Sequence, residues 1–151
     1  MLTIRRILVP VDFSEHSERA LEQAIELAKT IGAEVHLLHC YQLFPAGAVA
    51  TSYDVVVPES YERAVRESAT TSLSRWREKA SAQGIRAEQH VRADIPSHGI
   101  IALAEELPAD LIVMGTRGLT GFKHALLGSV AERTVRFAPC PVLTVKQKVA
   151  G

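Results

Sequence analysis

Apolar residues occur in two patterns along the chain, as short runs and as longer segments in which they recur every three or four positions. Short runs lie at residues 7–11, 34–41, 111–114 and 142–146, and a less apolar one lies at 85–93. A run without a polar face is typical of a strand that is covered on both sides in a parallel sheet. The pattern predicts five strands, with 111–114 central and 85–93 at an edge.

The recurring positions predict helices over residues 14–31, 59–83, 97–107 and 130–137. Gly32, Gly84 and Pro108 follow the first three helices as stop signals. The apolar stripes expected to face the core are Leu21, Ala24, Ile25, Ala28 and Ile31; Val65, Ala69, Leu73, Trp76 and Ala80; Ile100, Ile101, Ala104 and Leu107; and Val130, Thr134 and Phe137.

Alternation of strands and helices predicts an α/β fold with right-handed crossovers. We expect residues 1–151 to form a single doubly wound, Rossmann-like domain with about four helices and a five-stranded parallel sheet of order 3-2-1-4-5. Ligands of such sheets bind beyond the carboxyl ends of the strands, where the strand order reverses. That point lies between the first and fourth strands, so the turn at Asp12 and the loop at Gly115 should face one crevice.

The loop between strand 111–114 and helix 130–137 is rich in glycine, at positions 115, 118, 121 and 128. Glycine tolerates positive φ and, without a Cβ, lets a ligand approach main-chain N–H groups. The free N–H groups and positive dipole end of the following helix add to this chemistry. The loop is therefore a candidate phosphate site.

Each candidate residue also has a purely structural interpretation. The glycines would only shape a turn, and Ser129 with Glu132 three residues later forms a capping box pattern. Asp12 would be the N-cap of the first helix, with Glu15 at the third position. Arg117 would be a solvated loop charge, although an arginine among glycines suits phosphate. If Asp12 does bind a ligand, its carboxylate suits a hydroxyl or amino group and repels phosphate, which places phosphates toward Ser129.

Composition narrows the function classes. Lys plus Arg and Asp plus Glu both number 17, so no net basic field exists to hold nucleic acid or an anionic membrane.

Cys40 and Cys140 are isolated in sequence, which indicates buried thiols in a reducing compartment. No signal peptide or long apolar span is evident, and we expect a cytoplasmic protein. His36 and His39 lie three apart in a strand and should point to opposite faces, against a metal pair.

Two familiar phosphate motifs are missing. The first strand-to-helix turn, residues 9–14, has no glycine, so the GxGxxG dinucleotide fingerprint is absent, and no GxxxxGK[ST] P-loop occurs. The segment 42–58 has no clear period and is long for a connection, and its role stays open.

The pattern that remains is G-x2-G-x9-G-[ST], formed by glycines 115, 118 and 128 with Ser129. With residues 5–14, 38–39, 109–118, 127–133 and 139–143, it resembles the universal stress protein family in its ATP-binding branch. The resemblance implies ATP, or ADP or AMP, together with Mg²⁺. It implies base contacts from Pro10, Val11 and Asp12, with Cys40 as a wall where the family usually has an aliphatic residue. It also implies ribose and phosphate contacts from Met114, Gly115, Arg117 and Gly118, and phosphate-tail contacts from Gly128, Ser129 and Val130.

The fifth strand, with Val142, Leu143 and Val145, would be an unpaired apolar edge, which invites another chain. The family typically pairs this strand across a two-fold axis, so the resemblance implies a homodimer. It also implies a protein partner that the sequence does not identify.

The leading hypothesis is a nucleotide-dependent stress-response or signalling module and not an enzyme, because no obvious general base or activated nucleophile lies near the loop. Slow ATP hydrolysis stays open. The alternatives are a slow ATPase, a family member without nucleotide binding that acts as a dimeric interaction module, and a phosphoacceptor receiver domain. For the receiver, Asp12, Asp94, Thr116 and Lys146 would be the strand-end residues.

Overall fold

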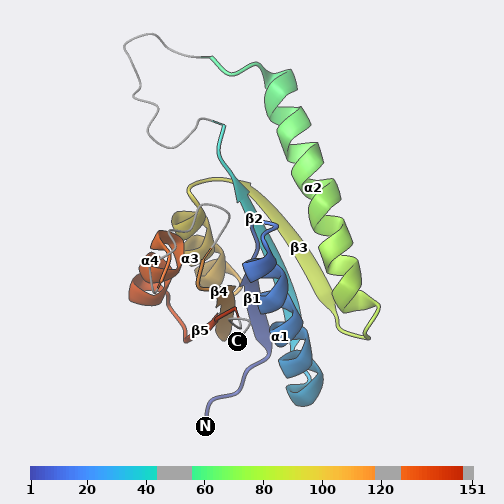
Figure 1. Cartoon of the computed structure of the whole chain (residues 1–151), viewed down its shortest axis with the longest axis vertical. Coiled ribbons are helices and arrows are strands. Elements are labelled where there is room, and N and C mark those ends of the chain that lie inside the picture. The colour runs from blue at the N-terminus through green and yellow to red at the C-terminus, as the bar shows by residue number, and fades with distance from the viewer. Residues whose placement is uncertain (44–55, 118–126, 148–151) are drawn as a thin grey trace.

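The computed structural model describes residues 1–43, 56–117 and 127–147 (Figure 1). The strands in these residues are β1 (Arg6–Pro10), β2 (Glu34–Tyr41), β3 (Ala87–Ala93), β4 (Leu111–Gly115) and β5 (Val142–Val145). The helices are α1 (Glu15–Ile31), α2 (Glu59–Ser81), α3 (Pro96–Glu106) and α4 (Ser129–Phe137). No helix in these residues is long and apolar enough to cross a membrane.

All strands pair in parallel in the order β3-β2-β1-β4-β5, which confirms the predicted order. β1 lies at the centre, with Val9 opposite Leu37 of β2 and Leu8 opposite Ile112 of β4. β3 and β5 are the two outer strands of this sheet. The carboxyl ends of β1 and β4 therefore meet at one edge.

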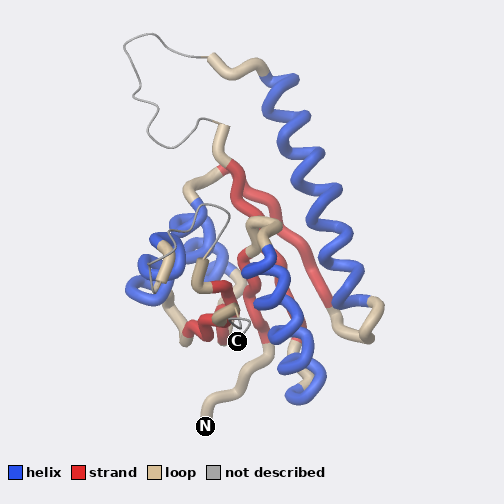
Figure 2. Tube along the Cα trace, in the orientation of Figure 1, coloured by secondary structure: helices blue, strands red, loops and turns tan. Residues whose placement is uncertain are grey.

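Helices cover both faces of the sheet, which confirms the doubly wound class (Figures 1 and 2). Helices α1 and α2 pack on one face, where Leu21, Ile25 and Leu73 join the odd-numbered residues of β1 and β2 in one buried cluster. Helices α3 and α4 pack on the other face, around Leu8 and Ile112. Strand β4 contributes to both clusters, as expected for a central strand without a polar side.

Strand and helix bounds differ from the predicted ones by no more than one residue, except at the end of α2 and the start of β3, which each differ by two. Helix α2 ends at Ser81 rather than at residue 83, and β3 begins at Ala87 rather than at residue 85. Gly84, with φ of +80°, makes the turn between them, and glycine adopts this φ without strain. The buried Ile85 belongs to this turn and not to the strand.

The predicted core stripes are correct in the helix centres and wrong toward some ends. Leu103 is buried on α3 where Ile101 was expected, and Ile101 is only half-buried. Ile31 and Phe137 are exposed, at 42% and 58%, because each is the last residue of its helix. Trp76 is half-buried and packs against the α1–α2 cluster.

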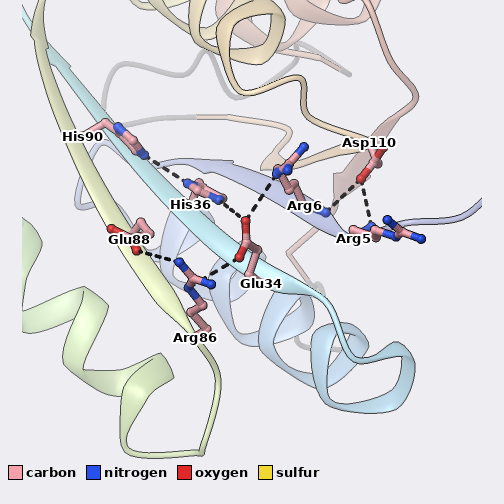
Figure 3. A network of polar contacts seen from close by, with 8 residues as sticks. All are labelled: Arg5, Arg6, Glu34, His36, Arg86, Glu88, His90 and Asp110. Carbon is pink, nitrogen blue, oxygen red and sulfur yellow. Dashed lines mark hydrogen bonds and ion pairs between the residues drawn. The ribbon is translucent and has the colours of Figure 1, made fainter.

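A polar network lies on the sheet near the amino ends of β2 and β3 (Figure 3). His36 Nε2 donates to Glu34 Oε1 at 3.0 Å, and His36 Nδ1 lies 3.1 Å from His90 Nε2, so one N–H lies between the two rings. Glu34 also pairs with Arg6 at 3.4 Å and Arg86 at 3.5 Å. The hydrogen bond from His36, with these cations, lowers the pKa of Glu34 despite partial burial.

Burial, with His36 and Arg92 nearby, lowers the pKa of His90 below its ordinary value of 6.5. The unfolded chain therefore binds a proton at a higher pH than the folded chain. The stability that depends on neutral His90 is complete above pH 6.5 and is lost as the pH falls below that value.

We predict that His90→Gln reduces the pH dependence of the free energy of unfolding between pH 7.5 and 5.5, measured by urea titration at each pH. The control is His98→Gln, which removes an exposed imidazole on α3. It should keep the wild-type dependence. Equal slopes in the His90 variant and the wild type would contradict the role given to His90.

Candidate functional site

The turn after β1 is fixed to β2 by backbone and side-chain hydrogen bonds. Val11 N–H donates to Leu38 O at 2.8 Å, and His39 Nδ1 donates to Val11 O at 2.8 Å. Pro10 is half-buried beside Leu38, and Val11 is buried. The sequence-predicted residues of this turn therefore offer a rigid main-chain segment at the carboxyl edge.

Phe13 lies in the same turn, and no sequence pattern singled it out. Its φ is +64°, which is uncommon for a residue with a bulky side chain. The ring lies 4.5 Å from the His39 ring and 5.4 Å from the Trp76 ring, centroid to centroid, and this packing holds the backbone in place. Strain of this kind often marks functional turns.

Asp12 orients the first turn of α1 without being its N-cap. Its Oδ1 accepts from Ser14 N–H at 3.0 Å and from Ser17 Oγ at 3.0 Å, and it also accepts from Ser14 Oγ. The N-cap is Ser14, whose Oγ accepts from Ser17 N–H at 3.2 Å. The interpretation of Asp12 with Glu15 as a cap was therefore wrong, because Phe13, with positive φ, turns the chain first and the cap position falls two residues later, on the extended Ser14.

Gly115, at the end of β4, is required by the protein's own packing. A Cβ at this position would lie 2.9 Å from the backbone oxygen of His16 on α1. Its φ is not in the left-handed region, so this position does not use glycine's tolerance of positive φ. The contact places the first turn of α1 directly against the end of β4, which brings the two predicted halves of the site together.

Gly128 closes the loop that begins at Thr116. Its N–H donates to Thr116 O at 2.6 Å, and a Cβ on Gly128 would lie 3.1 Å from the same oxygen. Its φ of −66° also rules out the positive-φ explanation. The two ends of the glycine-rich loop are thus joined. Gly118 and Gly121 lie outside the described residues, so their part in the pattern stays a prediction.

Ser129 is the first residue of α4 and not its cap, so the predicted capping box with Glu132 was wrong. The N-cap is Gly128, which has no side chain, and Glu132 N–H donates to Gly128 O at 2.9 Å. The N–H groups of Ser129, Val130 and Ala131 therefore have no acceptor within the helix. Ser129 is exposed, and its hydroxyl lies at the positive end of the helix dipole, where anions are stabilised.

Cys40 and Met114 present contrasting surfaces near the edge. Burial, with Asp94 nearby, raises the pKa of Cys40 to about 12, so the thiol stays neutral and behaves as a small apolar group. Its Sγ fills the space beside Gly99 of α3, where a Cβ would lie 2.5 Å away. Met114 is buried in the α3–α4 cluster, and so only its backbone lies at the edge. Cys140 is half-buried, like Cys40, and burial raises its pKa too.

The remaining predicted residues, Val130 and Arg117, are half-buried. Val130 packs against the α3–α4 cluster, which fixes the start of α4 to the sheet.

Four residues of this region were not predicted from the sequence, namely Phe13, Ser14, His16 and Ser17. The spacing Asp-x-Ser-x-x-Ser from Asp12 was the available signal for the two serines, because such residues commonly hydrogen-bond backbone N–H groups at helix starts.

The fold decides against two alternatives. Receiver domains have the order 2-1-3-4-5, whereas here β2 separates β1 from β3 and leaves Asp94 two strands away from Asp12. His36 and His39 point to opposite faces as predicted, since His36 contacts Glu34 and His39 contacts Val11. Among the described residues, no group of three His, Cys, Asp or Glu side chains is placed to hold a metal ion.

Comparisons with known proteins agree with this geometry. The model of the universal stress protein family matches residues 3–146. Universal stress protein MJ0531 of Methanocaldococcus jannaschii is 35% identical over 144 residues, which cover 95% of this chain and 82% of that protein. The solved structure of hypothetical protein MJ0577 has a TM-score of 0.80 and 27% identity, covering 98% of this chain and 99% of that chain.

Two similar structures hold adenine nucleotides. A universal stress protein in complex with cAMP has a TM-score of 0.64 and 25% identity, covering 97% of this chain and 99% of that chain. The universal stress protein of Archaeoglobus fulgidus in complex with dAMP has a TM-score of 0.66 and 26% identity, covering 97% of this chain and 100% of that chain.

We predict that Gly115→Ala lowers the free energy of unfolding by about 1–3 kcal/mol, because the new methyl group meets backbone that cannot rotate away. Urea unfolding followed by circular dichroism measures the change. The control is Ser129→Ala at an exposed position, which should stay near the wild type. Wild-type stability in the Gly115 variant would show that α1 does not lie as close to β4 as described.

Proposed function

Because the chain belongs to the universal stress protein family, we propose that it binds ATP, or ADP or AMP, at the carboxyl edge between β1 and β4. Mg²⁺ would accompany the phosphates. The complexes of two similar universal stress proteins with cAMP and dAMP support an adenine nucleotide as the ligand class.

The observation that carries this proposal is the uncapped start of α4. Gly128 has no side chain that could accept from the first N–H groups of the helix, and the adjacent Ser129 adds an exposed hydroxyl. Helix starts of this kind bind phosphate through backbone N–H groups and the helix dipole. Arg117 follows β4 at the same edge and supplies a cation for the phosphates.

The nucleoside would lie toward the turn after β1. Ser14 and Ser17 fix the Asp12 carboxylate in orientation, which suits a ribose hydroxyl or an amino group and disfavours phosphate. The main chain of Pro10 and Val11 is held against β2, and the neutral Cys40 thiol adds an apolar surface. Gly115 and Gly118 would line the ribose and phosphates, with Gly118 assigned from the sequence pattern alone.

We propose binding rather than catalysis as the activity, in a nucleotide-dependent stress-response or signalling module. The Cys40 thiol stays protonated and Asp12 already accepts hydrogen bonds from two serines, so neither is set up as a nucleophile or general base. Occupancy of the site would then control a partner protein. Slow hydrolysis of ATP would be incidental to this role.

The direct test is Ser129→Asp, which puts a negative charge where the phosphates would bind. We expect ATP affinity to fall by about tenfold or more, equivalent to about 1.4 kcal/mol. An acidic residue in the first turn stabilises a helix, so the loss cannot come from unfolding. Isothermal titration calorimetry with ATP and Mg²⁺ gives the affinity, and thermal unfolding verifies the fold.

The matched control is Ser60→Asp, which makes the same charge change on the exposed first turn of α2. It should bind ATP like the wild type. If the wild type binds no ATP at millimolar concentration, the chain is instead an interaction module without nucleotide. If Ser129→Asp binds as tightly as the wild type, the phosphates do not lie at α4.

We also propose a homodimer that pairs β5 with its copy. β5 is an outer strand of the sheet, and Leu143 on it is 45% exposed. Val135 and Phe137 on α4 add exposed apolar surface. An unpaired apolar strand of this kind favours association with another chain.

We predict that Leu143→Glu converts the dimer into a monomer of 16.5 kDa in sedimentation velocity at micromolar concentration. The reason is that a charge would be buried in the strand pairing without a partner. Tyr61→Glu, a similar change at an exposed position of α2, should leave the dimer intact. A monomeric wild type would contradict the proposal.

A further inference from the structure

A hollow lies at the opposite, amino-terminal edge of the sheet, away from the site proposed for the nucleotide. Its volume is about 790 Å³, and it is lined by the start of β1, the end of α1 and the turns that lead into β2 and β3. This volume is within the range of small-molecule sites. None of the residues assigned to the nucleotide contributes to it.

The side chains that line this hollow are strongly cationic. Arg5, Arg6, Lys29 and Arg86 face one carboxylate, Glu34, which gives a net charge of +3 from four cations and one anion. The whole chain has a net charge of zero. Positive charge is thus gathered in one concave surface, which concentrates anions from solution.

Glu34 is the one carboxylate among the lining residues, and it orients both arginines; just outside the lining, Glu88 pairs with Arg86 at 3.7 Å and Asp110 lies beside Arg5 and Arg6. Glu34 contacts Arg6 and Arg86 through their Nε atoms, at 3.4 Å and 3.5 Å, and it also accepts from His36. Both arginine contacts are longer than a good hydrogen bond. Figure 3 shows the two guanidinium groups on either side of Glu34. In the described residues, the terminal nitrogens of Arg6 have no ion pair.

Arg5 and Lys29 have no carboxylate partner for their charges in the described part of the chain. Asp110 accepts from the backbone N–H of Arg5, at 2.8 Å, and not from its guanidinium, which points away in Figure 3. Lys29 Nζ donates to the neutral side-chain oxygen of Gln83. Both residues are exposed, so these charges are available to a ligand.

The helix ends beside the hollow do not oppose an anion strongly, because their carbonyl groups are bonded internally. Ala28 O accepts from Gly32 N–H at 2.8 Å and from Ala33 N–H at 3.1 Å. Ala80 O accepts from Ile85 N–H at 3.2 Å. The apolar side chains of Ile4, Ile31 and Ile85 complete the lining and offer a surface for an organic group.

We propose that this hollow, called the amino-edge site, binds a small molecule that carries two or more phosphate groups. Arginine presents a planar fork of donors that matches phosphate oxygens in pairs, and lysine adds a point charge. The net charge of +3 on the lining favours a polyanion, although Glu88 and Asp110 outside the lining offset part of it. Through Glu34 and His36, which bridge β1, β2 and β3, an occupied site would also stiffen this edge of the sheet.

The test is a titration of the full-length ¹⁵N-labelled chain with sodium tripolyphosphate, followed by ¹H–¹⁵N spectra. The amide signals of Gly32 and Gly84, both in the lining, should shift and saturate. Sodium chloride at equal ionic strength should not move them. Arg5→Ala with Lys29→Ala should weaken binding by about tenfold or more, since two contacts to charged oxygens are lost.

The matched control is Arg63→Ala with Arg66→Ala, which removes the same charge from exposed positions on α2. It should retain the wild-type affinity. The dispersion of each spectrum verifies folding, and Arg5→Ala alone, which keeps the backbone bond to Asp110, replaces the double variant if that one unfolds.

Four results would overturn the proposal. One is that the amide signals of Gly32 and Gly84 do not shift at millimolar tripolyphosphate. Another is that both double variants lose affinity equally, which would indicate general charge attraction. An aspartate-rich peptide would shift them while tripolyphosphate does not, which indicates protein docking. Shifts confined to Gly115 and Gly128 would likewise reject the amino-edge site, yet they would support phosphate binding at the carboxyl edge. The inference therefore stands or fails separately from the proposed function.

Discussion

The close approach of α1 to β4 determines how the carboxyl edge is built. Gly115 has no Cβ, and the backbone oxygen of His16 occupies the space that a Cβ would need, at 2.9 Å. This contact brings the turn after β1 beside the end of β4, although the two are about a hundred residues apart in the sequence. Asp12 then fixes the first turn of α1 through Ser14 and Ser17. One backbone contact thus places a rigid carboxylate next to a loop that ends in an uncapped helix.

The parallel sheet gives its two edges opposite chemistry. Every helix that follows a strand in this fold begins near the carboxyl edge and ends near the amino edge, so the positive dipole ends gather on one side. At α4 that end is left open by Gly128. At the amino edge the helix carbonyls are bonded internally, and charge comes from side chains such as Arg6 and Arg86 around Glu34. Backbone donors would hold an anion at one edge, and guanidinium groups would hold one at the other.

Much of this architecture could be predicted from the sequence, because it depends on local periodicity. The apolar runs and helical stripes specified the strands, the helices and the α/β class, and the expected strand order 3-2-1-4-5 is the observed one. Details that depend on tertiary contacts could not be predicted. Glycine's tolerance of positive φ is not used at Gly115 or Gly128, and both are needed because backbone oxygens lie close to them. Ser129 fits the capping-box pattern, yet the preceding extended residue, Gly128, takes the cap position. Phe13 takes positive φ because His39 and Trp76, distant in sequence, pack against its ring.

The central claim is that the turn after β1 and the start of α4 form one nucleotide site. Hydrogen exchange with and without ATP and Mg²⁺ tests it most directly, because the N–H groups of Ser129 and Val130 have no acceptor within their helix. ATP should slow exchange at residues 128–131 and at residues 11–14 together, at the same ATP concentration. Protection at only one of these segments, or at neither with folded protein and millimolar ATP, would contradict it.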